Sequence, residues 1–245
     1  MWSFQIYIFK VCKEAYILND NTTAHKAEEY DGKIRSTIPN YEYFHSGTID
    51  LVKSINPSPE KWLDTGCGTG TLADLALNSF KNTIFFLADP SKDMLSIARK
   101  KLLHNKNNRV QILDPVASRD LKLPENEFDV ITAIQAHHYL DREGRKASVE
   151  NCFRMLKSGG IFITFENIRP FTASGIKVVL DRWKRFQMSC GKSEEEAQKH
   201  VGRFGREYFP VNIEEHIGLM RDTGFSTVEI LWVSYMQAGF YAIKE

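Results

Sequence analysis

Short apolar runs alternate along this chain with segments whose apolar residues recur at helical spacing. Leu72, Leu75 and Ala76 fall on one face of a helix that follows the short run "KWLD". Further short runs occur in "NTIFFLADP", "RVQIL", "EFDVITAI" and "IFITFENI". Strands that alternate with helices predict a parallel sheet with helices on both faces and right-handed crossovers.

Local signals mark where several of these elements begin and end. Ser91 precedes a helix-like run whose last turns are basic, as expected of an N-cap and of the helix dipole. The sequence "KSGG" at 157–160 predicts a turn, and Gly224 is expected to stop a later helix. The runs Val228–Ser234 and Ala238–Lys244 then follow with a connection too short for a helical crossover, so this pair is predicted to be antiparallel.

One segment breaks the alternation. Residues 167–212 carry two helix-like runs, Gly175–Met188 and Ser193–Val201, which predict an inserted helical cap over the carboxyl edge of the sheet. The predicted fold is therefore a doubly wound, Rossmann-like α/β sheet of seven strands, mostly parallel with an antiparallel C-terminal hairpin, plus the cap. Residues 1–29 are assigned to an N-terminal extension, whose first twenty residues fit an amphipathic helix, an edge strand or an extension from an early start codon.

Composition narrows the class of protein. The 245 residues are 42% hydrophobic and 26% charged with a formal net charge of +1, which is ordinary for a soluble globular domain and argues against a nucleic-acid partner. No apolar run is long enough for a membrane span, and no signal peptide is recognised. Cys12, Cys67, Cys152 and Cys190 show no C-x-x-C spacing, so we expect free thiols, no metal site and a cytoplasmic location.

Three glycines stand at alternate positions directly after the first strand. Gly66, Gly68 and Gly70 let the backbone adopt positive φ and approach a ligand closely, while the next helix presents free N–H groups. The spacing is neither the G-x-G-x-x-G of nicotinamide sites, because Thr71 occupies the sixth position, nor a P-loop. Asp64, two residues before the first glycine, would repel a pyrophosphate and suits a cationic amine.

A second acidic residue indicates another chemical group of the ligand. Asp89 ends the next strand, where an acidic residue accepts hydrogen bonds from ribose hydroxyls. An amine and a ribose without a phosphate are both present in S-adenosylmethionine.

From about Tyr30 to the C-terminus, the chain resembles the class I S-adenosylmethionine-dependent methyltransferases, small-molecule type. The resemblance rests on "LDTGCGTGTL", "LADPSKDML", "LPENEFDVITAIQAHHYL", "RMLKSGGIFITFE" and the closing "GF…VE" with its hairpin. It implies a methyltransferase domain over 30–245, with N-terminal lid helices at about 30–56 and the cap at about 167–212.

The resemblance also implies roles for individual residues. Asp64 and the backbone of Gly66, Cys67, Gly68 and Gly70 would hold the methionine part of S-adenosylmethionine.

Further contacts follow from the same resemblance. Asp89 would bind the ribose, Pro90 and Met94 would lie beside the adenine, and Gln135 would line the methyl region. Ala117 and Ser118 stand where the family usually has an Asp for the adenine amino group, so this contact departs from the pattern.

Candidate catalytic groups follow strands four and five. His137, His138 and Glu166 are hypothesised to act as bases or to orient an acceptor, and the alternatives are that the histidines only shape the pocket and that Glu166 pairs with an arginine. Substrate contacts are expected from Tyr30 and from three residues of the cap, with simple helix packing as the alternative. These three are Trp183, Arg206 and Tyr208.

The predicted activity is methyl transfer from S-adenosylmethionine to a small molecule, leaving S-adenosylhomocysteine. Two alternatives keep the fold: an enzyme that modifies wobble uridines of tRNA, and a protein that binds the cofactor without catalysis. Nicotinamide binding is the weakest alternative because of the glycine register. A monomer and a homodimer are both compatible with the sequence.

Overall fold

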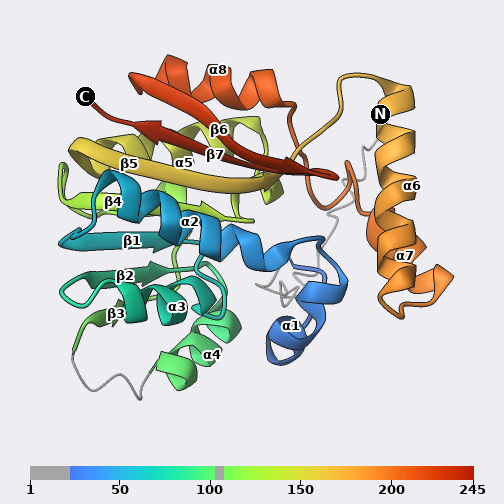
Figure 1. Cartoon of the computed structure of the whole chain (residues 1–245), viewed down its shortest axis with the longest axis horizontal. Helices are drawn as coiled ribbons and strands as arrows, with labels where there is room; N and C mark the ends of the chain where they lie inside the picture. Colours follow the sequence, from blue (N-terminus) through green and yellow to red (C-terminus); the bar gives the residue numbers. More distant parts are fainter. Residues whose placement is uncertain (1–22, 103–107) are drawn as a thin grey trace, which may run out of the picture.

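The computed structural model describes residues 23–102 and 108–245, and these form one seven-stranded sheet flanked by helices (Figure 1). The strand order is β3-β2-β1-β4-β5-β7-β6. The strands are β1 (Lys61–Thr65), β2 (Ile84–Ala88), β3 (Val110–Ile112), β4 (Phe128–Ile134), β5 (Leu156–Asn167), β6 (Thr227–Ser234) and β7 (Gln237–Ile243). Strands β1 to β5 pair in parallel and β7 is antiparallel to both neighbours, which confirms the predicted sheet and hairpin.

Helices cover both faces of the sheet. The N-terminal helices are α1 (Ala27–Lys33), η1 (Ile34–Ser36) and α2 (Tyr41–Ile55). The others are α3 (Thr71–Ser79), α4 (Lys92–Leu102), η2 (Ser118–Asp120), η3 (His137–Tyr139), α5 (Arg142–Met155), α6 (Ala173–Ser189), α7 (Glu194–Val201) and α8 (Ile213–Thr223). One core cluster joins the sheet to α2, α3 and α4, and the other joins it to α5 and α8.

Several element boundaries follow from the expected local signals. The Ser91 hydroxyl accepts a hydrogen bond from the Met94 N–H and so caps α4, as predicted. Gly224 ends α8 with φ of +115°, a conformation that favours glycine. The prediction of a turn at 157–160 is wrong, because α5 is followed directly by β5 at Leu156. These residues extend β5 because the backbones of Gly159 and Gly160 pair with Lys244 beyond β7.

Two helical regions cover the carboxyl edge of the sheet. Helices α6 and α7, which we call the cap, stand at this edge (Figure 1). Helix α1 lies at the same edge, facing the cap (Figure 1). The domain boundaries at residues 30, 167 and 212 remain predictions, and the extension at 1–22 lies outside the described residues. No helix within the described ranges is long and apolar enough to cross a membrane. The site described next therefore lies between the strand ends, α1 and the cap.

Candidate functional site

The glycine turn follows β1 at the point where strand order reverses in the sheet. Gly66, Gly68 and Gly70 have φ of +78°, +53° and +76°. A Cβ on Gly66 would lie 2.6 Å from the Ala136 Cβ, whereas a Cβ on Gly68 would meet no atom within 4 Å. The turn therefore packs tightly against the end of β4 and leaves free space at Gly68, as a ligand cradle requires.

A small cavity of about 30 Å³ lies against this turn, and we call it the donor cavity. It is bounded by the turn itself, by Ile134 and by three residues of the N-terminal helices, which are Tyr30, Tyr41 and His45. Asp64 also lines it, with only 2% of its surface exposed. The side chain is positioned by Thr132, whose hydroxyl donates to Asp64 Oδ1 at 2.7 Å.

The environment of Asp64 favours a cationic ligand. Burial raises the pKa of Asp64, a hydrogen bond from Thr132 lowers it, and the charge of Asp89 raises it, so that together they bring this pKa to about 7. A positive group placed beside this carboxylate would restore its charge. The residues present therefore fit the ammonium group of S-adenosylmethionine.

Asp89 lies at the end of β2, as predicted. Its two carboxylate oxygens accept hydrogen bonds from the N–H groups of Gly68 at 2.9 Å and Ser91 at 2.8 Å. The carboxylate thus touches the glycine turn directly. The carboxylate that we expect to bind the ribose therefore lies next to the free space at Gly68.

The predicted adenine residues differ in their exposure. Met94 is buried, and Pro90 is exposed. Ala117 lies just before η2. The Ser118 hydroxyl donates to Ser148 Oγ of α5 at 2.9 Å and lies 3.3 Å from His137 Nε2. Its hydroxyl is therefore engaged with α5, and we find no replacement for the family's usual carboxylate at this side chain.

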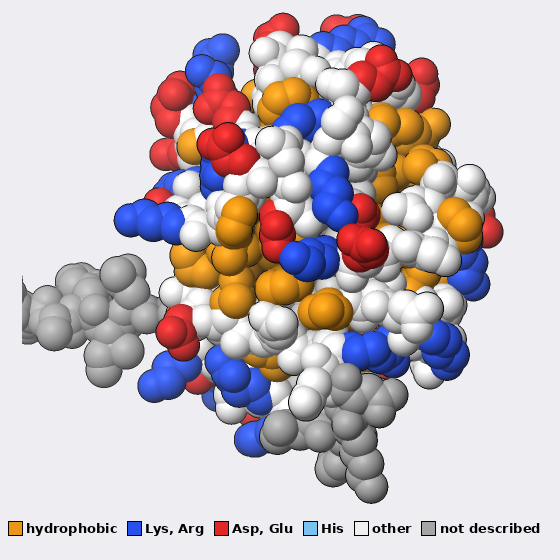
Figure 2. Space-filling model, turned by 90° about the vertical axis from the view of Figure 1, so that its left-hand side faces the viewer, with side chains coloured by type: hydrophobic (Ala, Val, Ile, Leu, Met, Phe, Trp, Pro, Cys, Tyr) orange, Lys and Arg blue, Asp and Glu red, His pale blue; other side chains and the backbone are white. Residues whose placement is uncertain are grey.

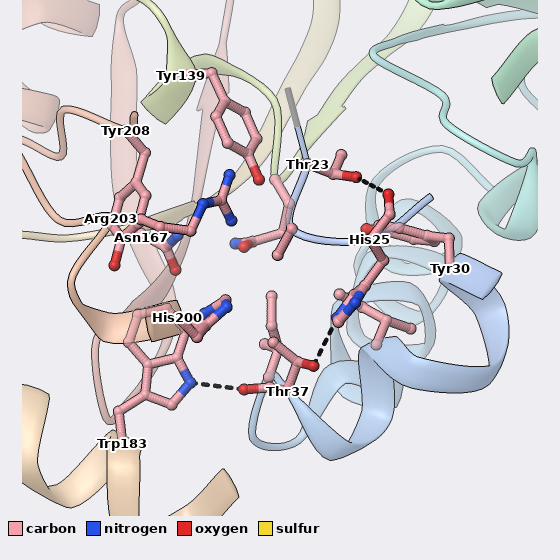
Figure 3. Close-up of a pocket in the computed structure, with 14 residues that line it drawn as sticks. Thr23, His25, Tyr30, Thr37, Tyr139, Asn167, Trp183, His200, Arg203 and Tyr208 are labelled. Carbon is pink, nitrogen blue, oxygen red and sulfur yellow. Dashed lines mark hydrogen bonds between the residues drawn. The ribbon is translucent and has the colours of Figure 1, made fainter. Parts of the chain in front are cut away.

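A second cavity, of about 20 Å³, lies between the strand ends, the N-terminal helices and the cap, and we call it the acceptor cavity (Figure 3). Tyr30 lines both cavities, while Ile134 and Gln135 line one each, so the two cavities meet at these residues. The other residues that line the acceptor cavity are Thr23, Ala24, His25, Ile34, Thr37, Ile38, Tyr139, Asn167, Trp183, His200, Arg203 and Tyr208.

Several polar atoms in this cavity lack partners. Gln135 Oε1, His200 Nε2 and the Tyr208 hydroxyl are buried and form no hydrogen bond with any described residue. Gln135 also has φ of +55°, a strained conformation for a residue other than glycine, and hydrogen bonds from its N–H and Nε2 to Phe165 O hold it there. Strain and unpartnered buried polar atoms are both typical of ligand sites.

The structure corrects part of the predicted substrate site. Tyr30, Trp183 and Tyr208 line the acceptor cavity, but Arg206 is exposed and does not. Arg203 lies there instead, and its guanidinium points toward the centre of the cavity (Figure 3). Both arginines precede Tyr208 in a segment without regular structure, so spacing alone does not tell them apart.

The predicted catalytic groups lie behind the wall of the cavity. Glu166 is fully buried and accepts hydrogen bonds from the N–H groups of His137 and His138, from His138 Nδ1 at 2.7 Å and from the Thr164 hydroxyl. None of His137, His138 and Glu166 lines the acceptor cavity. We therefore correct the hypothesis of direct bases: these residues fix the loop after β4 to the end of β5.

The charges of this buried cluster support the correction. Burial would raise the pKa of Glu166, but hydrogen bonding from His138 and the nearby histidines lower it to about 2. Burial lowers the pKa of His137 to about 4. A carboxylate held ionised by four donors is a poor proton acceptor, and it acts here as a positioning group.

Comparisons with known proteins agree with the fold and the turn. The family described as "Methyltransferase domain" matches residues 63–162. A carboxy-S-adenosyl-L-methionine synthase of Helicobacter hepaticus is 25% identical over 223 residues, which cover 86% of this chain and 90% of that protein. The mitochondrial 2-methoxy-6-polyprenyl-1,4-benzoquinol methylase of Schizosaccharomyces pombe is 30% identical over 136 residues, or 50% of this chain and 44% of that protein.

Solved structures share the architecture. A putative O-methyltransferase of Nostoc punctiforme has a TM-score of 0.63 and 15% identity, covering 89% of this chain and 59% of that one. A methyltransferase of Thermotoga maritima, described as a possible histamine N-methyltransferase, has a TM-score of 0.58 and 20% identity, covering 89% and 96%. These findings confirm the resemblance in fold: residues 63–162 match a methyltransferase domain, and the chain has the fold of the class I S-adenosylmethionine-dependent methyltransferases.

Proposed function

We propose that this protein transfers a methyl group from S-adenosylmethionine to a small molecule bound in the acceptor cavity. One observation carries the proposal: buried polar atoms of Gln135, His200 and Tyr208 lie unpartnered, among the described residues, in a cavity that meets the donor cavity at Tyr30. A buried polar group without a partner costs about 1–3 kcal/mol. A polar ligand in this cavity would recover that cost.

The chain's own residues divide between holding the donor and aligning the acceptor. Asp64 and the glycine turn would hold the methionine part, Asp89 the ribose, and Met94 and Ala117 the adenine. When bound, S-adenosylmethionine supplies an electrophilic methyl group on a sulfonium. The protein's main contribution to such a displacement is proximity and alignment in a site closed to water.

Acceptor alignment falls to the polar residues of the cavity. Burial, together with the nearby charges of Lys192 and Arg203, lowers the pKa of His200 to about 3, so its imidazole is neutral at physiological pH. The free ring nitrogen can then take a hydrogen bond from an acceptor hydroxyl or amine. Gln135 Oε1 and the Tyr208 hydroxyl offer further contacts to the same molecule.

Calorimetric titration with S-adenosylmethionine, S-adenosylhomocysteine and NAD tests the donor half. We expect micromolar binding of both adenosyl compounds and none of NAD. Asp89→Asn should weaken that binding at least tenfold. Asp129→Asn is the control, because Asp129 bonds backbone N–H groups at the opposite edge of the sheet. Absence of adenosyl binding would refute the proposal.

A second candidate is suggested by three relatives that are named carboxy-S-adenosyl-L-methionine synthases and align with 86–89% of this chain. Arg203 supports it, because a buried guanidinium in the acceptor cavity suits a carboxylate. Mass spectrometry of the reaction product separates the two activities. S-adenosylhomocysteine indicates methyl transfer, and a carboxylated S-adenosylmethionine indicates the second candidate.

A further inference from the structure

A much larger cleft lies between α1 and α7, with a volume of about 620 Å³. It shares His25, His200 and Arg203 with the acceptor cavity, so the two spaces adjoin through these side chains. The acceptor cavity itself, at about 20 Å³, has room for little more than one water molecule. An acceptor must therefore enter by an opening of the walls, and the cleft is the large space that borders it.

The cleft is cationic although the chain as a whole is nearly neutral. Five cationic and three acidic side chains line it. Two of the acids are already paired, Glu29 with Lys33 and Glu207 with Arg203. The third, Glu196, is engaged in the capping box of α7. Positive charge in excess at the mouth of a site attracts anions and raises their rate of association.

Lys192 is the most unusual of these cations. Its ammonium is half-buried and donates to Thr37 Oγ1 at 2.6 Å and to Gln187 Oε1 at 2.9 Å, both neutral oxygens. It forms no ion pair with any residue of the described ranges. Partial burial lowers its pKa to about 8. An ammonium that has lost water without gaining a counter-ion is stabilised when an anion binds.

The position of Lys192 joins the two walls of the site. Thr37, at the end of η1, accepts the Lys192 hydrogen bond and also bonds His25 Nε2 at 2.8 Å. The Thr37 carbonyl accepts a further hydrogen bond from Trp183 Nε1 of α6 at 2.7 Å (Figure 3). Contacts through Thr37 thus hold the N-terminal helices against the cap. An anion that draws Lys192 away from Thr37 would loosen this contact.

We propose that the cleft between α1 and α7 is the entrance for an anionic acceptor, and that Lys192 is the residue that selects and admits it. This inference rests on the proposed function and adds the charge class of its substrate. The acceptor cavity is lined by aromatic side chains, including Tyr139, Trp183 and Tyr208, so once its walls open it suits a ring, and the cationic cleft suits an anionic group on that ring.

The test uses the full chain saturated with S-adenosylhomocysteine and titrated with benzoate, phenyl phosphate and benzamide. Benzoate and phenyl phosphate distinguish a carboxylate from a phosphate, and benzamide is the neutral analogue of benzoate. We expect at least one anion to bind at least tenfold more tightly than benzamide, with an affinity that falls as salt rises. Lys192→Met keeps the length of the stem and should weaken that binding at least tenfold.

Lys177→Met is the matched control, because Lys177 is exposed on α6 and lines neither the cleft nor the cavity. It should change anion binding less than twofold. Affinity for S-adenosylhomocysteine should be unchanged in both variants, which separates this inference from the proposed function. Equal affinity for benzamide, absence of anion binding to the loaded protein, or equal effects of the two variants would each overturn the inference.

Discussion

The polar groups around Asp129, at the amino edge of the sheet, differ from those around Gln135, at the carboxyl edge, in whether they find hydrogen-bond partners. At the amino edge, Asp129 accepts hydrogen bonds from the N–H groups of Glu60 and Lys61 and pairs with Lys157 at 2.8 Å. Figure 2 shows this end of the molecule, where charges of both signs are interspersed. At the carboxyl edge, Gln135 and Tyr208 keep buried polar atoms without partners in the described part of the chain.

This difference separates stability from function within one sheet. Polar groups that are all satisfied contribute to the folded state and leave nothing for a ligand. Polar groups that are left unsatisfied cost stability, and that cost is recovered when a ligand binds. Matched substitutions at the two edges test this difference.

The largest contrast is expected between two glycines of nearly equal φ, Gly66 at +78° and Gly159 at +77°. Both Gly→Ala changes incur backbone strain of about 1–2 kcal/mol. Gly66→Ala also drives a Cβ against Ala136, whereas the Cβ of Gly159→Ala meets nothing. We expect Gly66→Ala to weaken S-adenosylhomocysteine binding about a hundredfold or more, near 2.7 kcal/mol by calorimetry. Equal affinity of the two variants for S-adenosylhomocysteine would contradict the role of the glycine turn in ligand binding.

A buried carboxylate and a partly exposed ion pair provide the second contrast. Glu166→Gln replaces an acceptor of four hydrogen bonds at a fully buried site, so it should lower the free energy of unfolding by about 3 kcal/mol. Lys157→Met removes a pair that is one-third exposed and should cost about 0.5 kcal/mol. Urea denaturation measures both. A smaller loss for Glu166→Gln would contradict the positioning role assigned to this residue.

The third contrast concerns pH. Burial raises the pKa of Asp64 to about 7, so the unliganded site carries a proton below that pH and a cationic donor must displace it. Affinity for S-adenosylmethionine should therefore fall as pH drops below about 7, approaching tenfold per pH unit. Because the folded pKa of Asp64 exceeds its unfolded one, this carboxyl by itself contributes stability that is lost as pH rises from about 4 to 7. Buried histidines such as His137 and His200, whose pKa values are lowered, act in the opposite direction, so ligand affinity and not stability is the measurement.

Thr132→Val provides the control for this pH profile. The Thr132 hydroxyl donates to Asp64 and lowers its pKa, so removing it should move the fall in affinity to higher pH. Titration calorimetry across the range measures both profiles. An affinity that does not change with pH in either protein would remove Asp64 from the donor site.

The smallest contrast involves two hydroxyls. Tyr208→Phe removes a buried hydroxyl without a partner in the described ranges, so it should raise the free energy of unfolding by about 1 kcal/mol. Thr83→Val, at the amino edge, leaves the Pro59 carbonyl unpaired and should cost about 1 kcal/mol. Denaturation midpoints test this order. A loss of stability for Tyr208→Phe would show that its hydroxyl supports the fold.

The donor half of the site could be predicted from the sequence because its signals are local. Asp64, the alternating glycines and Asp89 lie at strand ends, and a strand end fixes where its next residues must point. The antiparallel hairpin was predictable for the same reason, since a short connection between Val228–Ser234 and Ala238–Lys244 leaves no room for a crossover. The prediction of a turn at 157–160 was wrong because the backbone there pairs with Lys244, which lies far away in the chain.

The acceptor half depends on tertiary placement and could be predicted only in part. Trp183 and Tyr208 were found because aromatic residues in a cap tend to be buried. The choice of Arg203 over Arg206 depends on how the segment after α7 folds back on the sheet. His137 and His138 carry the right chemistry at the right strand end, but the Glu166 carboxylate draws their loop behind the cavity wall.

Tyr30 has a consequence for the order of events during turnover. Its side chain borders both cavities, so any displacement by one ligand changes the space left for the other. Such coupling is reciprocal: if the donor raises affinity for the acceptor, the acceptor must raise affinity for the donor by the same factor. If the two cavities hold the proposed donor and acceptor, this tyrosine on α1 couples their binding, so that each ligand helps to keep the other bound until the methyl group has moved.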